Sequence, residues 1–338
     1  MDRTVFLSTL ERGLARAARS ANGEWPVEFL LPDQQLLCLA TDPLNPDVVY
    51  AGTRGGGVLR SDDRGESWRP AGLGEQVVKA LAVSPLEQGV IYAGTKPPML
   101  FVSRDGGASW TELDAFRGMR RPYWFTPAEP GAPYVQSIAL SPTDPGVIVA
   151  GIEFGAVLRS ADGGQTWRGH MKGALRDCHG LFFHPRDGGW VYEAGGTGGG
   201  VAFSRDGGIT WAQPKAGLDR HYGWACAADP ARPEVWYASV APTFVFPHFG
   251  KYPIAHYDGY AHAGIFRKTG DAGWINLGGG LPQPIDYMPY ALLTDPAAPG
   301  HVYAGLSNGD VWHSADHGNS WAQLPFNLSG IHRSMVAL

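Results

Sequence analysis

Short apolar segments alternate with Gly-, Pro- and Asp-rich segments along nearly the whole chain. Within residues 76–116, four such segments follow one another: VVKALAV, GVIYAGT, MLFVS and SWTEL, with turn-forming sequences such as SP, KPP and RDGG between them. Segments of this length, rich in β-branched and aromatic residues and bounded by turn residues, predict β-strands joined by tight turns. The pattern therefore predicts a four-stranded antiparallel unit.

The unit recurs, and a proline at the end of its first strand marks each copy. The marker prolines are Pro43, Pro85, Pro142, Pro185, Pro230 and Pro296. Their spacings are 42, 57, 43, 45 and 66 residues, so two copies carry insertions of about 15 and 23 residues. A four-stranded unit that repeats at this interval is typical of the blades of a β-propeller.

The two ends of the chain together supply one more unit. The C-terminal HRSMVAL (332–338) resembles the first strand VKALAV (78–83), and residues 1–30 continue with the second, third and fourth strands. We therefore predict an all-β chain forming one seven-bladed propeller, closed by its C-terminal strand so that no sheet edge stays free. The predicted blades are 331–338 with 1–30, 34–74, 76–116, 134–173, 177–218, 222–281 and 288–328.

One octapeptide occurs five times with little change: SDDRGESW (61–68), SRDGGASW (103–110), SADGGQTW (160–167), SRDGGITW (204–211) and SADHGNSW (314–321). An aspartate in such a turn accepts hydrogen bonds from backbone N–H groups, here expected one and two residues further on, and glycine supplies positive φ. The tryptophan is expected to pack against the outer part of its blade. We therefore assign a structural role, rather than a catalytic one, to Asp63, Asp105, Asp162, Asp206 and Asp316.

These octapeptides resemble the BNR or Asp-box repeat, S-x-D-x-G-x-x-W, of sialidases, sortilin-type receptors, xyloglucanases and photosystem-assembly propellers. The blade openings SPLEQGVIYAGT and DPAAPGHVYAGL are most similar to the xyloglucanase and assembly-factor branch. The resemblance implies that the turns join third and fourth strands, on the rim opposite the usual binding face. It does not extend to a typical sialidase, which has six blades and an FRIP segment that is missing here. Nor do xyloglucanase cleft carboxylates match this chain residue by residue.

The first strands carry the main candidate site. Six residues before each marker proline, and at the equivalent position of the closing strand, stand Leu37, Lys79, Gln136, His179, Trp224, Tyr290 and Arg333. We call this set the mouth ring. Two residues further on lies an apolar ring of Leu39, Leu81, Ile138, Leu181, Cys226, Leu292 and Met335. Because unpaired polar groups are costly to bury, the two rings predict a central funnel with a polar mouth and a sealed apolar floor; the alternative is a water-filled channel without a ligand.

The two insertions, 114–133 and 240–264, are rich in aromatic residues and are expected on the face of the mouth ring. Long loops on a rigid scaffold often carry function, although the second insertion has the alternative of packing on its own aromatics. The candidate ligand-binding residues are Gln136 and Trp224 of the mouth ring, His221 and Tyr222 at the start of a first strand, and, from the insertions, Arg120, Tyr123, Trp124, His256 and Asp258.

Two hypotheses for the function follow. The first is binding of a small polar, anionic or carbohydrate-like ligand, or of a protein partner, at the funnel. The second is a hydrolase or lyase with His179 as acid or base and Lys79, Tyr290 and Arg333 near the reacting atoms. A metal ion held by His179, His221, His256 and His262 is a weaker hypothesis because their spacing is irregular, and no other cofactor is expected. Glu193 stands where its counterparts are Tyr or Val, and indicates either a bulge or a site residue.

The composition limits the classes of binding partner and the cellular compartment that we expect for this protein. The formal net charge is −5 and the isoelectric point about 6.1, which disfavours nucleic acid and anionic membranes as partners. Three cysteines make no disulfide framework and favour a reducing compartment. The N-terminal sequence lacks a continuous apolar segment, so we expect a cytoplasmic protein without a signal peptide.

Overall fold

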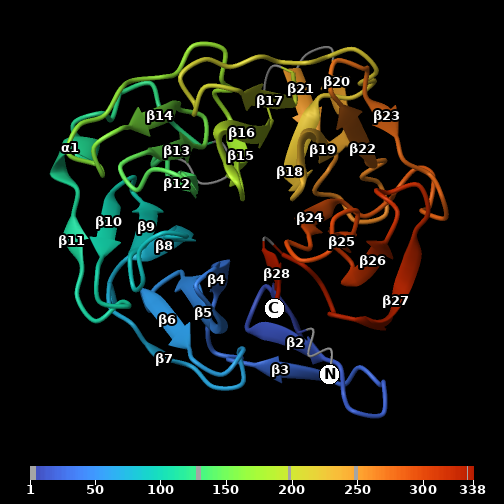
Figure 1. Cartoon of the computed structure of the whole chain (residues 1–338), viewed down its shortest axis with the longest axis horizontal. Coiled ribbons are helices and arrows are strands. Elements are labelled where there is room, and N and C mark those ends of the chain that lie inside the picture. Colours follow the sequence, from blue (N-terminus) through green and yellow to red (C-terminus); the bar gives the residue numbers. More distant parts are fainter. Residues whose placement is uncertain (1–4, 127–130, 197–198, 247–249, 333) are drawn as a thin grey trace.

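The computed structural model describes residues 5–126, 131–196, 199–246, 250–332 and 334–338. Seven antiparallel sheets stand around a central channel as the blades of a propeller, and an eighth, two-stranded sheet belongs to the second insertion (Figure 1). The predicted fold class is confirmed. The single helix among the described residues, α1 (Asp114–Arg117), opens the first insertion, and the described part of the chain contains no helix long and apolar enough to cross a membrane.

In blades 2 to 7 the strands follow chain order from the centre of the ring to the rim (Figure 1). Blade 2 consists of β4 (Leu36–Asp42), β5 (Asn45–Thr53), β6 (Val58–Ser61) and β7 (Arg69–Pro70). Blade 3 consists of β8 (Val77–Val83), β9 (Ile91–Lys96), β10 (Leu100–Ser103) and β11 (Thr111–Glu112). Blade 6 consists of β18 (Tyr222–Asp229), β19 (Arg232–Ala241), β22 (Gly264–Thr269) and β23 (Ile275–Asn276). Blade 7 consists of β24 (Pro289–Thr294), β25 (Val302–Leu306), β26 (Asp310–Ser314) and β27 (Ala322–Asn327).

Two blades have a reduced fourth strand. Blade 4 contains β12 (Val135–Leu140), β13 (Ile148–Ile152) and β14 (Val157–Ser160), and blade 5 contains β15 (Cys178–His184), β16 (Asp187–Gly195) and β17 (Val201–Ser204). In each, one isolated antiparallel bridge occupies the fourth position, Arg159 with Arg168 and Phe203 with Ala212. The four-stranded plan therefore continues around the ring, with the fourth strand reduced to a single bridge in blades 4 and 5.

The closing strand pairs as predicted. In blade 1, β28 (Met335–Ala337) lies beside β1 (Val5–Thr9), followed by β2 (Leu14–Ala18) and β3 (Val27–Leu30). The amide of Val5 donates to the carbonyl of Leu338 at 3.1 Å, and the Leu338 amide donates back at 2.9 Å. Because both chain ends meet in one sheet (Figure 1), the closing strand covers the inner edge of β1.

Neighbouring blades pack closely where second strands carry an Ala-Gly pair. A Cβ atom on Gly94 of β9 would lie 2.5 Å from Cγ1 of Val135 in the first strand of the next blade. A Cβ on Gly52 of β5 would lie 2.7 Å from Cγ1 of Val78 in the same way. Glycine thus allows the inner strands of adjacent blades to approach within van der Waals contact.

The octapeptide turns are hydrogen-bonded through their aspartates. Asp105 Oδ1 accepts from the Ser103 hydroxyl and the Ser109 amide, both at 2.8 Å, and Oδ2 accepts from the Ser109 hydroxyl at 2.5 Å. The same contacts recur at the other four aspartates. The amide donor lies four residues further on, not one or two as expected, because Gly106 and Gly107 adopt φ of 71° and 92° and turn the chain back. The hydrogen bonds from Ser109 lower the pKa of Asp105 to about 2.

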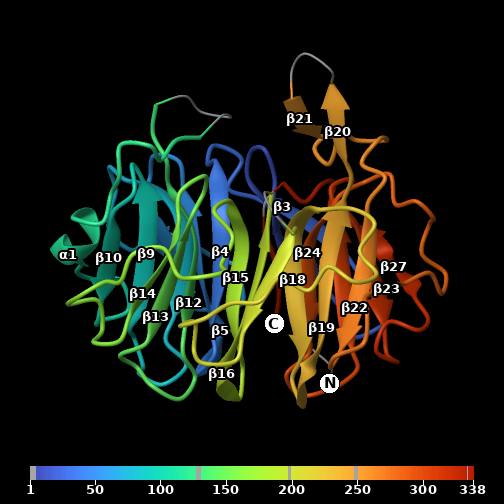
Figure 2. The same ribbon diagram turned by 90° about the horizontal axis from the view of Figure 1, so that it is seen from above.

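Both insertions lie on one face of the ring (Figure 2). The second insertion contains the hairpin β20 (Thr243–Phe246) and β21 (Gly250–Pro253), which projects from this face. Because strands alternate in direction, the turns after second strands and those after third strands lie on opposite faces. The octapeptide turns are therefore on the face away from the insertions.

Candidate ligand site at the channel mouth

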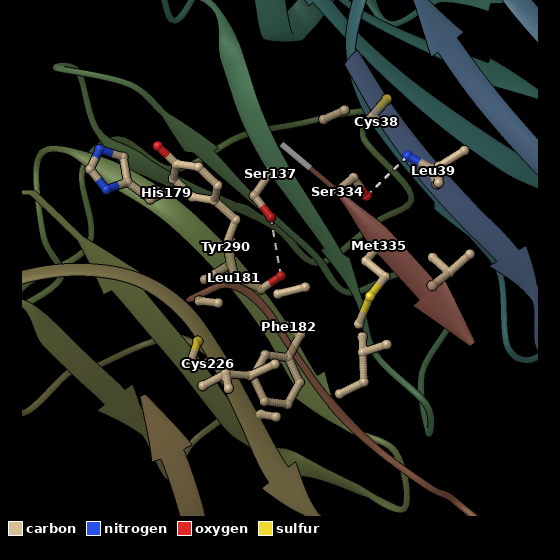
Figure 3. A pocket seen from close by; sticks show the side chains of 18 of the residues that line it. Cys38, Leu39, Ser137, His179, Leu181, Phe182, Cys226, Tyr290, Ser334 and Met335 are labelled. Atoms are coloured by element: carbon tan, nitrogen blue, oxygen red, sulfur yellow. Dashed lines mark hydrogen bonds between the residues drawn. The ribbon is translucent and has the colours of Figure 1, made fainter. Parts of the chain in front are cut away.

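A cavity of about 560 Å³ runs along the central channel and is lined by first strands. Every described residue of the mouth ring lines it, namely Leu37, Lys79, Gln136, His179, Trp224 and Tyr290; Arg333 lies outside the described residues. Figure 3 labels His179 and Tyr290 among the lining residues, together with Leu181, Phe182 and Cys226. We call the end that carries the mouth ring the channel mouth.

A β-bulge directs each of these side chains into the channel. The pairing register of β8 with β9 passes from Val78 to Ala80 and leaves Lys79 unpaired. The same irregularity occurs at the other five described ring positions: Leu37, Gln136, His179, Trp224 with Ala225, and Tyr290. A bulge adds an unpaired residue and changes the direction of its side chain. The position six residues before each marker proline is therefore the position of a β-bulge in the first strands of blades 2 to 7.

The apolar ring lines the same cavity but does not close it. All seven of its members contribute to the cavity wall. The lining continues beyond them to Thr41, Pro185, Thr294 and Pro296, at the opposite ends of the first strands. The expected sealed floor is therefore wrong, because aliphatic side chains from seven first strands leave the axis of the ring open.

An aromatic cluster forms the part of the mouth that belongs to blades 5, 6 and 7. The ring of Trp224 has its centroid 4.6 Å from that of His179 and 5.0 Å from that of Tyr290. His256 of the second insertion lies between two tyrosines: Nε2 is 2.7 Å from the Tyr222 hydroxyl, and Nδ1 is 2.7 Å from the Tyr290 hydroxyl. Five of the predicted site residues thus meet in one cluster.

Other candidates lie away from the cavity. Asp258 accepts a hydrogen bond from the Ser307 hydroxyl at 2.5 Å and so fastens the insertion to blade 7. Trp124 is 6% exposed and packs in the core of blades 3 and 4, whereas Tyr123 is 64% exposed. Arg120 and His221 are exposed, and neither lines the cavity.

The histidine metal site is not supported by the geometry. Nδ1 of His262 lies 3.4 Å from a carboxylate oxygen of Asp286, away from the mouth cluster. Among the residues that the structure describes, no three or more His, Cys, Asp or Glu side chains are grouped so that they could hold a metal ion.

His179 has both ring nitrogens in contact with acceptors. Nδ1 lies 2.8 Å from the carbonyl oxygen of Gly223, and Nε2 lies 3.5 Å from Oδ1 of Asp177. Burial lowers the pKa of His179, but the Asp177 carboxylate and the Gly223 carbonyl outweigh it, so its pKa is raised. The ring therefore presents its face and carbon edge, rather than a free nitrogen, to its surroundings.

Lys79 is held against an aromatic ring. Its Nζ lies 3.9 Å from the ring centroid of Tyr134, and the residue is only 4% exposed. A cation over an aromatic face is attracted by the ring quadrupole. The side chain contributes to the cavity wall, while its ammonium is buried beside Tyr134.

Blade 5 contains two buried carboxyl groups that were not described correctly from the sequence. Asp177 was not named as a candidate, and Glu193 was aligned with the wrong positions of the other repeats. Asp177 is 1% exposed and precedes His179 by two residues, on the same side of an extended chain, which was the available signal. Glu193 is fully buried and accepts from the Leu175 amide at 2.9 Å. It pairs with Leu181, the position that alanine holds in the other repeats, for example Ala51 opposite Leu39. The expected Tyr or Val counterparts were therefore wrong by one register position, and burial raises the pKa of Glu193 well above its usual range.

Comparison with known proteins supports the fold and leaves the family open. No family model matches the chain, and no curated protein matches it. Among solved structures, a GH74 enzyme of Niastella koreensis is 18% identical over 95% of this chain and 52% of its own, with a TM-score of 0.69. The GH74 xyloglucanase of Xanthomonas campestris is 18% identical over 86% of this chain and 45% of its own, with a TM-score of 0.61.

A third solved structure, YCF48 bound to D1 peptide, is 16% identical over 85% of this chain and 81% of its own, with a TM-score of 0.56. The chain thus spans about half of the GH74 enzymes and most of YCF48. At these identities the likeness shows the fold alone. The class that fold and comparison together define is the seven-bladed β-propeller.

Proposed function

We propose that this propeller binds a small polar, carbohydrate-like ligand at the channel mouth, against the wall formed by Trp224 and Tyr290. The observation that carries the proposal is the repeated bulge, which directs six unlike side chains into one cavity. If the repeats served only as a scaffold, the bulged position of each first strand would not need a different residue in every blade. A cavity of about 560 Å³ is of the size that small-molecule sites have.

The wall has the mixture of surfaces that such a ligand requires. Trp224 and Tyr290 offer amphipathic aromatic surface, and Gln136, Ser137 and Ser334 add polar groups to the lining. The Ser137 hydroxyl donates to the Leu181 carbonyl at 3.2 Å, and Ser334 accepts from the Leu39 amide at 3.3 Å (Figure 3). These bonds fix the hydroxyl positions, which favours recognition of a defined ligand. A xyloglucanase among the structural neighbours supports a carbohydrate-like class.

Binding is favoured over turnover at His179. A general acid or base must reach the proton it transfers through a ring nitrogen, and both nitrogens of His179 already contact Gly223 and Asp177. The enzyme alternative, with Lys79, Tyr290 and Arg333 near the reaction, therefore requires His179 to rearrange. Binding of a protein segment at the same face is the other alternative, favoured by the peptide-bound YCF48 structure among the neighbours.

The test is a ligand screen against a matched pair of variants. A panel of mono- and oligosaccharides and short peptides is added to the protein, and binding is followed by thermal shift and then by NMR titration. Trp224→Ala is expected to weaken a saccharide hit about tenfold through the loss of ring contact. The control is Phe29→Ala, at a 59% exposed ring on the outer strand of blade 1, which should leave the affinity unchanged.

Three other outcomes of the screen would contradict the proposed site or support one of the alternatives. A saccharide that binds equally well to Trp224→Ala excludes the proposed site. Binding of peptides alone supports the partner alternative. Turnover of a hit that disappears in His179→Gln, with the fold intact, supports the enzyme alternative.

A further inference from the structure

The contact between Asp177 and His179 requires a shared proton. Nδ1 of His179 faces the Gly223 carbonyl oxygen at 2.8 Å, which only accepts, so Nδ1 carries a hydrogen. Nε2 faces Oδ1 of Asp177 at 3.5 Å. Two lone pairs facing each other in a buried place are unfavourable, so a proton lies between Nε2 and Oδ1. Within the described residues, Oδ1 of Asp177 is buried and has no hydrogen-bond partner, and Nε2 of His179 is the group in ion-pair contact with it.

The pair is almost completely buried. The side chains of His179 and Asp177 are 3% and 2% exposed. A Cβ on Gly196 would lie 2.1 Å from Oδ2 of Asp177 and 2.8 Å from Cε1 of His179, so the chain after β16 passes directly over both groups. Water is therefore a poor substitute for either member of the pair.

The other titratable groups around His179 come from three elements. Glu153 follows β13, is 8% exposed and accepts from the Thr126 hydroxyl at 3.4 Å. Glu193 of β16 is buried, and burial together with the nearby Asp177 raises its pKa. Tyr222 of β18 has its ring centroid 5.1 Å from that of His179 and bonds to His256. The carboxyl groups of Asp177 and Glu153 favour a cationic His179. Of this set, His179 is the residue that lines the cavity.

We propose that Asp177 is a positioning residue that keeps His179 cationic and fixed against Trp224, and that the site thereby selects a ligand carrying a carboxylate. This inference rests on the proposed function, since it names the charge of the ligand for that same wall. His179 lines the cavity and Asp177 does not, so the member of the pair on the cavity wall is the positive one. A carboxylated sugar bound against Trp224 is attracted to it, whereas a neutral sugar is not.

The first experiment reads the charge of His179 without any ligand. Nitrogen-15 NMR of the histidine rings distinguishes an imidazolium from either neutral tautomer. We expect His179 to carry protons on both nitrogens at pH 7.5, and Asp177→Asn to convert it to the neutral form protonated on Nδ1. Asp271→Asn, at a fully exposed side chain, is the control and should change nothing. A neutral His179 in the unaltered protein at this pH overturns the proposal.

The second experiment measures whether the site prefers a carboxylated sugar, by comparing its affinities for glucuronate and for glucose. We expect glucuronate to bind about fivefold more tightly than glucose, and this ratio to fall towards one as the pH rises and His179 loses its proton. Asp177→Asn should bring the ratio of the two affinities to about one. If Asp177→Asn is unfolded by circular dichroism, His179→Gln replaces it, with the same expectation for the ratio.

The two proposals fail in different ways. Equal binding of both sugars, unaffected by either variant, overturns the role of Asp177 and leaves the proposed function standing. If neither sugar binds although His179 is an imidazolium, the proposed function fails, and the selection of a carboxylate fails with it.

Discussion

Two carboxyl groups of blade 5 are shielded from water to the same degree and have different partners. Asp177 meets a histidine ring, whereas Glu193 meets the Leu175 amide through one oxygen and leaves Oε1 without a hydrogen bond in the described part of the chain. Burial stabilises the neutral form of an acid. At the scale of the residue, Glu193 is thus a carboxyl group that folding keeps protonated.

Glu193→Gln should flatten the dependence of stability on pH. The folded-state pKa of Glu193 is raised above its usual value, so the unfolded chain loses this proton first as the pH rises. The free energy of unfolding then falls above about pH 4.5, by up to about 1.4 kcal/mol per pH unit, until the folded-state pKa is reached. Urea unfolding between pH 4.5 and 8 measures this slope. Glu75→Gln, at an exposed position, should retain the slope; an equal slope in Glu193→Gln would falsify the prediction.

Gly196→Ala should destabilise the protein by disturbing the Asp177–His179 pair. Its Cβ would lie 2.1 Å from Oδ2 of Asp177 and 2.9 Å from a ring carbon of Tyr222, so these groups must move. We expect a loss of about 1 to 3 kcal/mol in chemical denaturation. Gly55→Ala is the matched control, because a Cβ there meets nothing within 4 Å. Equal stability of the two variants would contradict this account of the close approach.

At the scale of the element, the octapeptide turn holds the third and fourth strands of a blade together. Its aspartate, serine and tryptophan bond to one another or to nearby backbone; the Trp211 indole, for example, donates to the Gly208 carbonyl at 3.0 Å. Blade 6 lacks the octapeptide, and other residues form the hydrogen bonds of the equivalent turn. Lys268 Nζ donates to the carbonyls of Gly270 and Ala272, both at 2.6 Å, and Trp274 remains buried. The blade therefore survives the loss of its recognisable motif.

Asp206→Ala should lower stability by about 1 kcal/mol, a small value because the turn is exposed to water. The residue accepts from the amide and hydroxyl of Thr210 at 2.8 and 2.6 Å. Burial alone would raise its pKa, but these bonds lower it. Its contribution is therefore present above the usual aspartate pKa and is lost as the pH falls through the lowered value. Thermal unfolding at pH 7 and pH 3 measures both effects, and Asp271→Ala should show neither.

At the scale of the whole molecule, stability depends on closing the ring. Met335 of β28 is buried in one core cluster with Phe6 of β1 and Val311 of β26, so the closing strand joins the first and last blades. Hydrogen bonds from both directions connect it to β1. The closing strand thus supplies both a sheet partner and interblade core.

Removal of residues 332–338 should lower the unfolding temperature and cause association at micromolar concentration. The deletion exposes the edge of β1, and free edges pair with other chains. Differential scanning calorimetry and light scattering give the two readouts. Gln323→Lys, at an exposed position of blade 7, is the control for a change outside the closure. A truncated chain that stays monomeric with an unchanged melting temperature would show that closure is not needed.

The sequence by itself determined the repeat, the seven blades, the closing strand and the positions of the mouth ring. These features follow from local patterns, because each copy of about 42 residues contains its own apolar strand segments and its own turn-forming residues. Only the tertiary structure decided which ring members have partners. Gly223 reaches His179 from the next blade, and His256 reaches Tyr222 and Tyr290 from an insertion. Such contacts depend on bulges and on how adjacent blades pack, and no periodic pattern along the chain encodes either.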